Sequence, residues 1–321
     1  MSSSMLAESA HAGDDDFRHE AFFYAGEKEF ADGTSAFLAD GIRAGEPALV
    51  VGSSRKIDLL RRRLKTDAGQ IVFADMADVG TNPAWIIPAW TDFVSQYGAR
   101  PLRGIGEPIW AERSPAELVE CQRHESLLNV AFAGSSGFTL MCPYDTAALG
   151  QDVVDEARRS HPFIRRDGTQ WTSDVYPGTD TLARPFSKPL TQPPAWRVER
   201  GFQTGSLGGL RSLVLREAVK AGLSEARAGD AVVAVNEVAS NSVCHGGGGG
   251  VLRIWQTADA LICEVSDDGD IDEPLVGRAR PDFDTRGGRG LWMVNQLCEL
   301  VQLRSFTSGT TVRMHVSRQP G

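Results

Sequence analysis

Residues 236–250 of the chain read NEVASNSVCHGGGGG and place Glu237, Asn241 and His245 at intervals of four before five consecutive glycines. At about 100° per residue, these three polar side chains span about 80° of one helical stripe. The small and apolar positions nearby centre roughly opposite that stripe, and they are Ala231, Val232, Val235, Val238, Ala239, Ser242 and Val243. The pattern predicts a helix over about 224–244 that packs one face on a sheet, with His245 as a structural end-cap. Taken alone, the polar stripe is more typical of a helix face that meets water.

Three further patterns follow the stripe in a fixed order. VSDDGDI (265–271) places Asp267 and Gly269 at the end of an expected strand, GGRGLWMV (287–294) is a glycine loop that opens a helix, and SGTTVRM (308–314) begins the second strand of a hairpin. Glycines at a helix N-terminus let backbone N–H groups approach phosphate oxygens, and the helix dipole favours the negative charge. One such loop is a weak signal, but four elements in this order indicate a nucleotide site.

These residues resemble a known ATPase fold. Residues from about 200 to 316 are similar to the GHKL (Bergerat) ATPase domain that histidine kinases and anti-sigma-factor serine kinases share. NEVASNSVCHG resembles its N box, SDDGDI and GGRGL resemble its two glycine boxes, and GTTVRM resembles its final threonine-bearing box. The resemblance implies a C-terminal α+β sandwich, and the residue patterns independently predict the same class through two helices, a hairpin, a helix and a second hairpin.

The resemblance also implies a role for each matching position. Glu237 would be the general base, and Asn241 would coordinate Mg²⁺. The positions implied for ATP binding are Asp267 and Gly269 at the adenine, Gly288, Arg289 and Gly290 at the phosphates, and Thr310 in support of the adenine site. Mg²⁺ prefers oxygen ligands and keeps several waters, so one amide oxygen beside the phosphates is sufficient.

Two features qualify the resemblance. Ile271 stands where the family's first glycine box usually has a second glycine, which makes the fold a firmer expectation than the nucleotide affinity. The lid between the glycine boxes, residues 270–287, is short and holds Arg278, Arg280 and Arg286. A short lid resembles the anti-sigma serine kinases more closely than the histidine kinases.

The first half of the chain alternates strand and helix patterns. Strands are expected over 46–54, 70–76, 101–107 and 137–145, and a helix is expected to begin with Ser114 as N-cap and Pro115 at its first position. This alternation predicts an α/β domain with a mostly parallel sheet and helices on both faces. The segment VVGSSRKIDLL (50–60) lacks the spacing of a phosphate loop, so no nucleotide is expected there.

This half resembles the MEDS sensory domain, named from methanogen and methylotroph regulators. The similarity begins in FRHEAFFYAGEKEFADGTSAFLADGIRAGEPALVV (17–51) and continues through DMADVGTNPAWIIPAW, RGIGEPIW, ECQRHESLLN and CPYD. A MEDS domain joined to a GHKL domain is similar to the RsbA-type anti-sigma regulatory proteins of actinobacteria. The expected organisation is a disordered tail (1–16), a MEDS-like sensory domain (17–176), a proline-rich linker (177–199) and a GHKL ATPase/kinase domain (200–321).

Composition excludes several classes of function. The net charge of −9, without a basic patch, argues against direct nucleic-acid binding. The N-terminus lacks the features of a signal peptide, and no apolar run reaches the ~18 residues of a membrane span. Five scattered cysteines indicate a reduced cytoplasmic protein. Cys121, His124, Cys142 and His161 could form a metal site, although such residues more often pack in cores.

The expected function is that of a cytoplasmic anti-sigma factor and ATP-dependent serine kinase. It would bind a stress-type sigma factor and phosphorylate an anti-anti-sigma (STAS-type) partner, and its N-terminal domain would sense a small-molecule or protein signal; a homodimer is compatible with the sequence. A histidine kinase is one alternative, because QRHESLLN (122–129) resembles a phosphoacceptor box and His124 lies 113 positions before Glu237. An anti-sigma binding protein with a degenerate ATPase site is another, because of Ile271.

Overall fold

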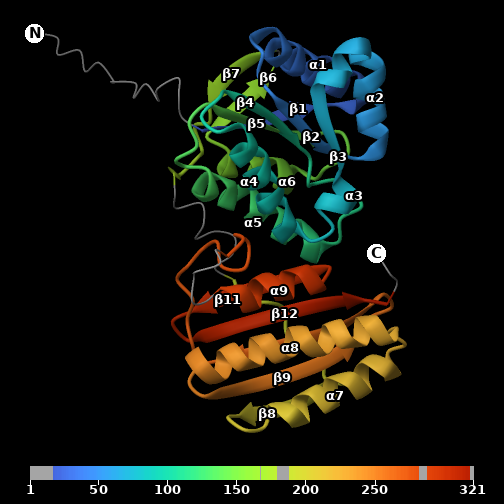
Figure 1. Ribbon diagram of the computed structural model, residues 1–321, viewed down its shortest axis with the longest axis vertical. Coiled ribbons are helices and arrows are strands. Elements are labelled where there is room, and N and C mark those ends of the chain that lie inside the picture. Colours follow the sequence, from blue (N-terminus) through green and yellow to red (C-terminus); the bar gives the residue numbers. More distant parts are fainter. Residues whose placement is uncertain (1–16, 167, 179–187, 282–287, 319–321) are drawn as a thin grey trace, which may run out of the picture.

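Two sheets, each covered by helices, make up the fold in the computed structural model (Figure 1). The structure describes residues 17–166, 168–178, 188–281 and 288–318. Within these ranges, the N-terminal sheet has the strand order β3-β2-β4-β5-β1-β6-β7 and the C-terminal sheet has the order β11-β12-β10-β9-β8. Outside the described residues lie the tail expected over 1–16, residues 179–187 of the expected linker, and Arg286 of the lid.

The N-terminal sheet is parallel except at one edge. Its strands are β1 (Arg18–Tyr24), β2 (Ala48–Gly52), β3 (Ile71–Asp75), β4 (Leu102–Gly106), β5 (Phe138–Asp145), β6 (Phe163–Arg166) and β7 (Thr169–Thr172). Only the last pairing, between β6 and β7, is antiparallel. The strands expected over 46–54, 70–76, 101–107 and 137–145 are all present, whereas the patterns did not single out β1, β6 and β7. The sequence-based prediction of a mostly parallel sheet is confirmed.

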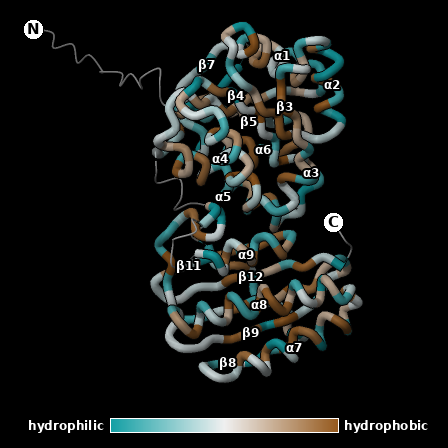
Figure 2. Tube along the Cα trace, in the orientation of Figure 1, coloured by the Kyte–Doolittle hydropathy of each residue, from teal (hydrophilic) through white to brown (hydrophobic). Residues whose placement is uncertain are grey.

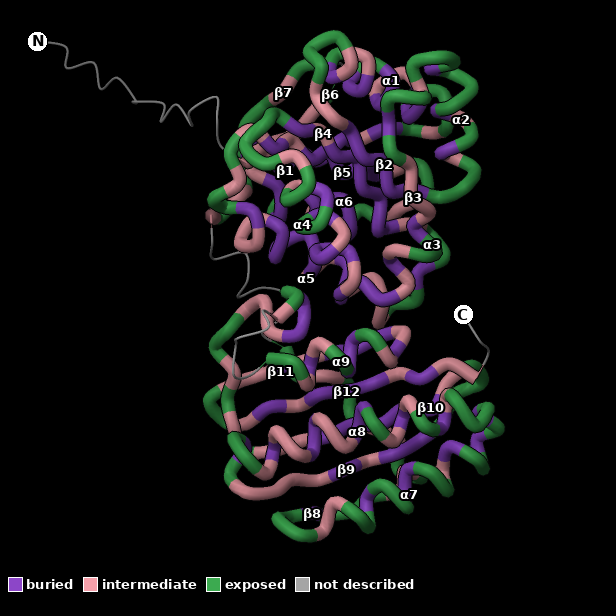
Figure 3. The backbone as a smooth tube through the Cα atoms, in the orientation of Figure 1, coloured by how far each residue is buried: buried purple, intermediate pink, exposed green. Residues whose placement is uncertain are grey.

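Helices cover both faces of this sheet, as expected. They are α1 (Gly26–Ala44), α2 (Ser54–Leu64), α3 (Met76–Val79), α4 (Ile86–Tyr97), α5 (Pro115–Ala131) and α6 (Gln151–Ser160), with 3-10 turns η1 (Lys65–Gln70) and η2 (Pro83–Trp85). Helices α1 and α2 contribute to one apolar cluster, and α4, α5 and α6 contribute to another on the opposite face. Every residue of β2 is buried, which is typical of a parallel strand between two helical layers, and Figure 3 shows the parallel strands as strongly buried.

Helix α5 begins where the sequence predicts. The Ser114 hydroxyl accepts a hydrogen bond from the backbone N–H of Glu117, and the Glu117 carboxylate accepts one from the backbone N–H of Ser114, which completes a capping box. The helix buries three ionisable side chains, Glu120, His124 and Glu125. They are buried because α5 packs against the N-terminal sheet and also contacts the C-terminal domain.

The C-terminal domain is an antiparallel sheet with helices on one face. Its strands are β8 (Val198–Gln203), β9 (Gly249–Gln256), β10 (Ala260–Asp267), β11 (Leu300–Phe306) and β12 (Gly309–Ser317), and its helices are α7 (Leu207–Lys220), α8 (Glu225–His245) and α9 (Arg289–Leu297). All three helices share one apolar cluster with the sheet. Figure 2 shows hydrophilic and hydrophobic stretches alternating along α7 and α8, as expected for amphipathic helices. The predicted α+β sandwich is confirmed.

Two elements of this domain differ from the sequence pattern. The sequence pattern predicts a helix over 290–301 that overlaps a hairpin predicted over 300–316; α9 ends at Leu297, and β11 starts at Leu300, which pairs with His315 of β12. Pairing with the neighbouring strand therefore overrides the helical periodicity of these last residues. Strand β8, which pairs with β9, was not predicted, and its first residues lie in the segment expected to be linker.

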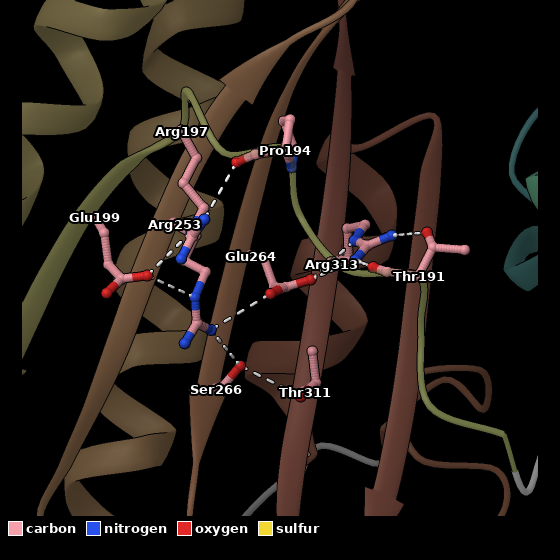
Figure 4. Close-up of polar contacts among 9 residues, drawn as sticks. All are labelled: Thr191, Pro194, Arg197, Glu199, Arg253, Glu264, Ser266, Thr311 and Arg313. Atoms are coloured by element: carbon pink, nitrogen blue, oxygen red, sulfur yellow. Dashed lines mark hydrogen bonds and ion pairs between the residues drawn. The ribbon is translucent and has the colours of Figure 1, made fainter.

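The face of the C-terminal sheet opposite the helices is polar and carries the end of the linker (Figure 4). Arg313 donates hydrogen bonds to the Thr191 carbonyl oxygen at 2.5 Å and to the Glu264 carboxylate at 2.6 Å. Arg253 donates to the carboxylates of Glu199 and Glu264 on either side of it. The linker around Thr191 is therefore bound across this face.

Candidate functional site

The polar stripe of α8 faces the start of α9. Ala231, Val235 and Val238 of α8 are buried against the sheet, while Glu237 and Asn241 are half-buried on the other side. Within the described part of the chain, the hydrogen bonds that the structure shows leave the Glu237 and Asn241 side chains unused. The stripe is therefore neither fully solvated nor consumed by internal contacts, which is the state expected of groups that receive a ligand.

Gly290 brings the two polar side chains into one place. A Cβ at this position would lie 3.2 Å from Glu237 Oε2 and 3.3 Å from Asn241 Nδ2. Any larger residue would fill the space between the first turn of α9 and the stripe. The glycine therefore keeps a small cradle open beside the carboxylate and the amide.

The N-terminus of α9 completes this end of the site. Gly288 is the N-cap with φ of 76°, a left-handed conformation that favours glycine, and Arg289 is the first helical residue. The first backbone N–H groups of a helix lack intrahelical partners and lie at the positive end of its dipole. A phosphate group suits this position, and the Asn241 amide oxygen beside it suits Mg²⁺. The residues present fit a magnesium-bound nucleotide phosphate.

Asp267 lies beside the C-terminal turn of α8, where β10 ends. Its Oδ2 accepts a hydrogen bond from the Ser242 hydroxyl at 2.5 Å, and its Oδ1 accepts one from the backbone N–H of Gly269 at 2.9 Å. Because a carboxylate can accept about four hydrogen bonds, the fixed group keeps capacity for an amino group of a ligand.

Gly269 and Thr310 pack directly around this carboxylate. A Cβ at Gly269 would lie 2.8 Å from the Cα of Gly246, so no side chain fits there. The Thr310 hydroxyl donates to the Gly269 carbonyl oxygen at 2.8 Å and holds the loop in place. The structure thus places Asp267, Gly269 and Thr310 together, as the sequence motifs require, and His245 is exposed at the end of α8.

Ile271 has a structural environment of its own. Its backbone N–H donates to the Ser305 hydroxyl at 2.7 Å, and its side chain packs against the apolar cluster of the C-terminal domain. The departure from the family pattern therefore supplies core packing at the base of the lid.

The described part of the lid is docked on the N-terminal domain. Leu275 packs against the apolar cluster that contains α5, and Arg278 forms a buried ion pair with Glu120 at 3.0 Å. Arg304 of β11 pairs with the other oxygen of Glu120 at 2.8 Å. Burial lowers the pKa of Arg278, and Glu120 acts in the opposite direction. At the surface, Arg280 pairs with Asp92 of α4 at 3.0 Å.

Helix α9 is held by the N-terminal domain as well. The Asn82 amide donates to the Asn295 carbonyl oxygen at 3.1 Å and to the Cys298 carbonyl oxygen at 2.9 Å, and the Trp85 indole donates to the Asn295 carbonyl oxygen at 2.6 Å. The Asn295 amide in turn donates to the Gly277 carbonyl oxygen of the lid at 2.8 Å. The N-terminal domain therefore contacts two elements of the candidate nucleotide site, the lid and α9, and sequence reasoning identified none of these contacts.

Comparisons with known protein families agree with this architecture. Residues 18–162 match the MEDS model, the methanogen/methylotroph DcmR sensory domain, and residues 203–316 match the histidine kinase-like ATPase domain. The chain therefore carries an N-terminal MEDS domain and a C-terminal ATPase domain of the histidine kinase-like type.

The chain is also similar to a solved structure, the crystal structure of the RsbU and RsbW domains of a Mycobacterium tuberculosis protein. The two share 19% sequence identity with a TM-score of 0.29, and the match covers 39% of this chain and 34% of that chain. The match thus spans about a third of that protein's solved length. The comparison with curated proteins found no match. Among the helices of the described residues, none combines the length and hydrophobicity needed to cross a membrane.

Proposed function

We propose that this protein is a cytoplasmic anti-sigma factor with ATP-dependent serine kinase activity. Its substrate would be a serine of an anti-anti-sigma partner with a STAS-type fold, and its second partner would be a stress-type sigma factor. The observation that carries the proposal is the cradle at Gly290, where the Glu237 carboxylate and the Asn241 amide meet the N-terminus of α9.

Each residue of the cradle has a distinct task. The Asn241 amide oxygen would hold Mg²⁺, Gly288, Arg289 and Gly290 would bind the phosphates, and Asp267 with Gly269 and Thr310 would bind the adenine. ATP supplies the phosphoryl group when bound. Glu237, one helical turn before the Mg²⁺ ligand, would accept the proton of the partner's serine hydroxyl at its carboxylate.

The docked lid supports a regulatory role for the MEDS domain. Arg278 cannot reach a phosphate while its guanidinium is buried against Glu120, and Asn82 fixes α9 from the same side. A signal at the N-terminal domain that moves α5 or η2 would change both contacts. We propose that the MEDS domain controls the kinase through these contacts, with a small molecule or a protein as its signal.

The geometry of His124 disfavours a histidine kinase. This side chain is 1% exposed in the middle of α5, between the N-terminal sheet and the C-terminal domain. A phosphoacceptor histidine must reach the γ-phosphate, whereas burial lowers the pKa of His124 to about 3 and keeps it from the surface.

Ile271 favours a second candidate function, that of an anti-sigma binding protein without phosphotransfer. Its side chain packs at the base of the lid where the family's pattern has glycine, and in this candidate it narrows nucleotide entry. This candidate shares the partners of the first proposal and differs only in chemistry.

One experiment separates these functions. The full-length protein is incubated with γ-labelled ATP, Mg²⁺ and purified STAS-type proteins from the same organism. Acid-stable label on a partner serine supports the kinase, acid-labile label on the protein itself supports a histidine kinase, and ATP binding without transfer supports the binding protein. Asn241→Ala should abolish the transfer, while Asn236→Ala on the same helix, which removes a surface contact with Arg211, should not.

A further inference from the structure

Four potential metal ligands meet inside the N-terminal domain, far from the proposed nucleotide site in the fold. His19 lies on β1, Cys142 on β5, Glu125 on α5, and His161 directly follows α6. All four are buried, and one ligand atom of each lies within 4.8 Å of the ligand atoms of the others. Two strands of the sheet and the two helices α5 and α6 on one of its faces therefore each bring a ligand to the same buried site.

Hydrogen bonds outside the cluster fix the ring nitrogen that carries the proton in each histidine. The Asn129 amide donates to the Ser160 carbonyl oxygen at 2.7 Å, which turns its own oxygen toward His19 Nδ1 at 3.1 Å. His161 Nδ1 lies 2.8 Å from the Ala157 carbonyl oxygen, which can only accept. In the neutral form of either ring, Nδ1 is therefore the donor and Nε2 presents a lone pair.

Those lone pairs face other acceptors. His19 Nε2 lies 3.1 Å from Glu125 Oε2, and His161 Nε2 lies 3.4 Å from the same oxygen. Glu125 Oε1 and His161 Nε2 have no hydrogen-bond partner within the described residues. With both rings neutral, the Cys142 thiol, with Sγ 3.4 Å from His19 Nε2, is the one of the four groups that brings a proton into the cluster. Buried acceptors that face one another are costly, because each has lost its contact with water.

We propose that His19, Glu125, Cys142 and His161 bind a divalent transition-metal ion of the zinc type. A cation at the centre would give all four acceptors a common partner. Bond lengths of about 2.0–2.3 Å in a tetrahedral site require ligand atoms roughly 3.3–3.8 Å apart. Glu125 Oε2 lies 3.1 Å from His19 Nε2 and 3.4 Å from His161 Nε2, Cys142 Sγ lies 3.4 Å from His19 Nε2, and the other ligand atoms lie within 4.8 Å. A set of two imidazoles, one thiolate and one carboxylate suits zinc or a similar metal, and it does not suit Mg²⁺ or Ca²⁺.

The surroundings of the cluster resemble the support that metal ligands usually have. Asn129 and the Ala157 carbonyl hold the far nitrogens of the two histidines, and such outer contacts orient the ligands and tune their affinity. The Cys121–His124 pair, which sequence spacing connects to Cys142 and His161, is not part of the cluster, since the Cys121 thiol donates to the Pro108 carbonyl oxygen at 3.4 Å. His19 of β1 and Glu125 of α5 complete the cluster instead.

The site is also linked to the domain interface by one helix. Helix α5 carries Glu125 into the cluster and Glu120 to Arg278 and Arg304 of the C-terminal domain. Loss of the ion would leave Glu125 facing the histidine lone pairs on the helix that anchors the lid. The proposed site does not depend on the kinase activity, because its ligands all belong to the N-terminal domain.

The test uses the full-length protein and two metals. Protein from zinc-supplemented cells should retain about one Zn²⁺ per chain after desalting, and a strong chelator should remove it only when the protein is partly unfolded. The metal-free protein should bind Co²⁺ with a thiolate-to-cobalt charge-transfer band. Wild-type protein that retains no stoichiometric zinc and gives no such band would overturn the proposal without recourse to any variant.

Variants then assign the ligands. Cys142→Ser should lose the charge-transfer band, whereas the matched control Cys121→Ser, also a buried cysteine of this domain, should keep it. Asn129→Leu leaves all four ligands in place and should lower zinc affinity about 10- to 100-fold. Thermal unfolding of each variant confirms that it is folded. A band that persists in Cys142→Ser, or an affinity unchanged in Asn129→Leu, contradicts the assignment.

Discussion

Arg278 of the lid and Glu120 of α5 form a buried ion pair across the domain interface, with Nη2 3.0 Å from Oε2. Arg304 from β11 approaches the other carboxylate oxygen at 2.8 Å. One carboxylate therefore forms ion pairs with two buried guanidinium groups, one from the lid and one from the sheet. This arrangement makes Glu120 the point at which the N-terminal domain holds the lid.

Glu120→Gln should release the lid. It removes the one carboxylate charge that pairs with both buried arginines, and breaking a buried pair costs about 3–5 kcal/mol. We expect faster amide hydrogen exchange over residues 270–281, while α8 stays protected. The measurement is hydrogen exchange followed by mass spectrometry on the full-length protein.

Glu112→Gln is the matched control, because Glu112 is an exposed glutamate of the same domain. It should leave exchange in the lid at the wild-type rate. If Glu120→Gln also left it unchanged, the lid would be held by Leu275 and Asn295 rather than by the ion pair.

The sequence predicts those features of the candidate site that depend on residues close together in the chain. Glu237 and Asn241 share a helix, and the glycine boxes lie at turns whose backbone requirements are visible in the residues themselves. The structure brings these positions together as the motifs require, but their roles in binding and catalysis stay predictions, as do the domain boundaries 17–176, 177–199 and 200–321.

The interface escaped prediction because its contacts join residues far apart in the chain. Asn82 and Asn295 are 213 positions apart, and neither lies in a motif that indicates a partner. The four-ligand cluster is similar: spacing draws attention to Cys121 with His124, whereas the fold joins His19 to Cys142 through the parallel pairing of β1 and β5. Periodicity and spacing predict which residues share a face of one helix or strand. Contacts between distant segments depend on the order of the strands in the sheet, which these patterns do not give.

Asp267→Asn should weaken adenine-nucleotide binding about 10- to 100-fold. The asparagine can still accept from the Gly269 N–H and pair with the Ser242 hydroxyl, so the fold should persist, but a charged acceptor for the adenine amino group is lost. Isothermal calorimetry with ATP and Mg²⁺ measures the change. Asp268→Asn, at the exposed neighbouring position, is the control, and an ATP affinity in Asp267→Asn equal to wild type would remove Asp267 from the site.

Gly290→Ala should reduce phosphotransfer more than it reduces stability. The new methyl group would lie 3.2 Å from Glu237 Oε2 and 3.3 Å from Asn241 Nδ2, so both side chains must shift away from the start of α9. Gly209→Ala serves as the control, because a Cβ there meets no atom within 4 Å and should stabilise α7 by about 0.5–1 kcal/mol. The assay compares initial rates of ATP-dependent labelling with melting temperatures. Equal rates in the two variants would show that the cradle is not used.

His315 of β12 should make the protein less stable in acid. Burial, with a smaller effect from the Arg313 charge, lowers the pKa of His315 from 6.5 to about 4. Since the folded pKa lies below the unfolded value, the unfolded chain binds more protons between these two values. The stability present above about pH 6.5 is therefore lost as the pH falls toward 4.

His315→Gln should flatten this dependence. The difference in free energy of unfolding between about pH 7 and about pH 4.5 should shrink by about 2–3 kcal/mol relative to wild type. Urea unfolding at the two pH values gives the measurement. His245→Gln, which changes an exposed histidine at the end of α8, should leave the wild-type dependence intact, and a similar result for His315→Gln would refute the prediction.

Glu237→Gln tests the proposed chemistry most directly. The amide keeps the shape of the side chain and its reach toward Gly290 but cannot accept the serine proton. We expect ATP affinity and sigma-factor binding to stay near wild type, because neither requires a base, while phosphorylation of the STAS-type partner falls about 10²- to 10⁴-fold. Such a variant would remain an anti-sigma factor that can no longer inactivate its antagonist.

The control for this variant is Glu225→Gln, in the exposed first turn of the same helix. It should phosphorylate the partner at the wild-type rate, since Glu225 lies three turns before the cradle. Single-turnover labelling separates the transfer step from nucleotide exchange. If Glu237→Gln transferred phosphate as fast as Glu225→Gln, Glu237 would not be the general base, and the proton would have to leave the serine by another route.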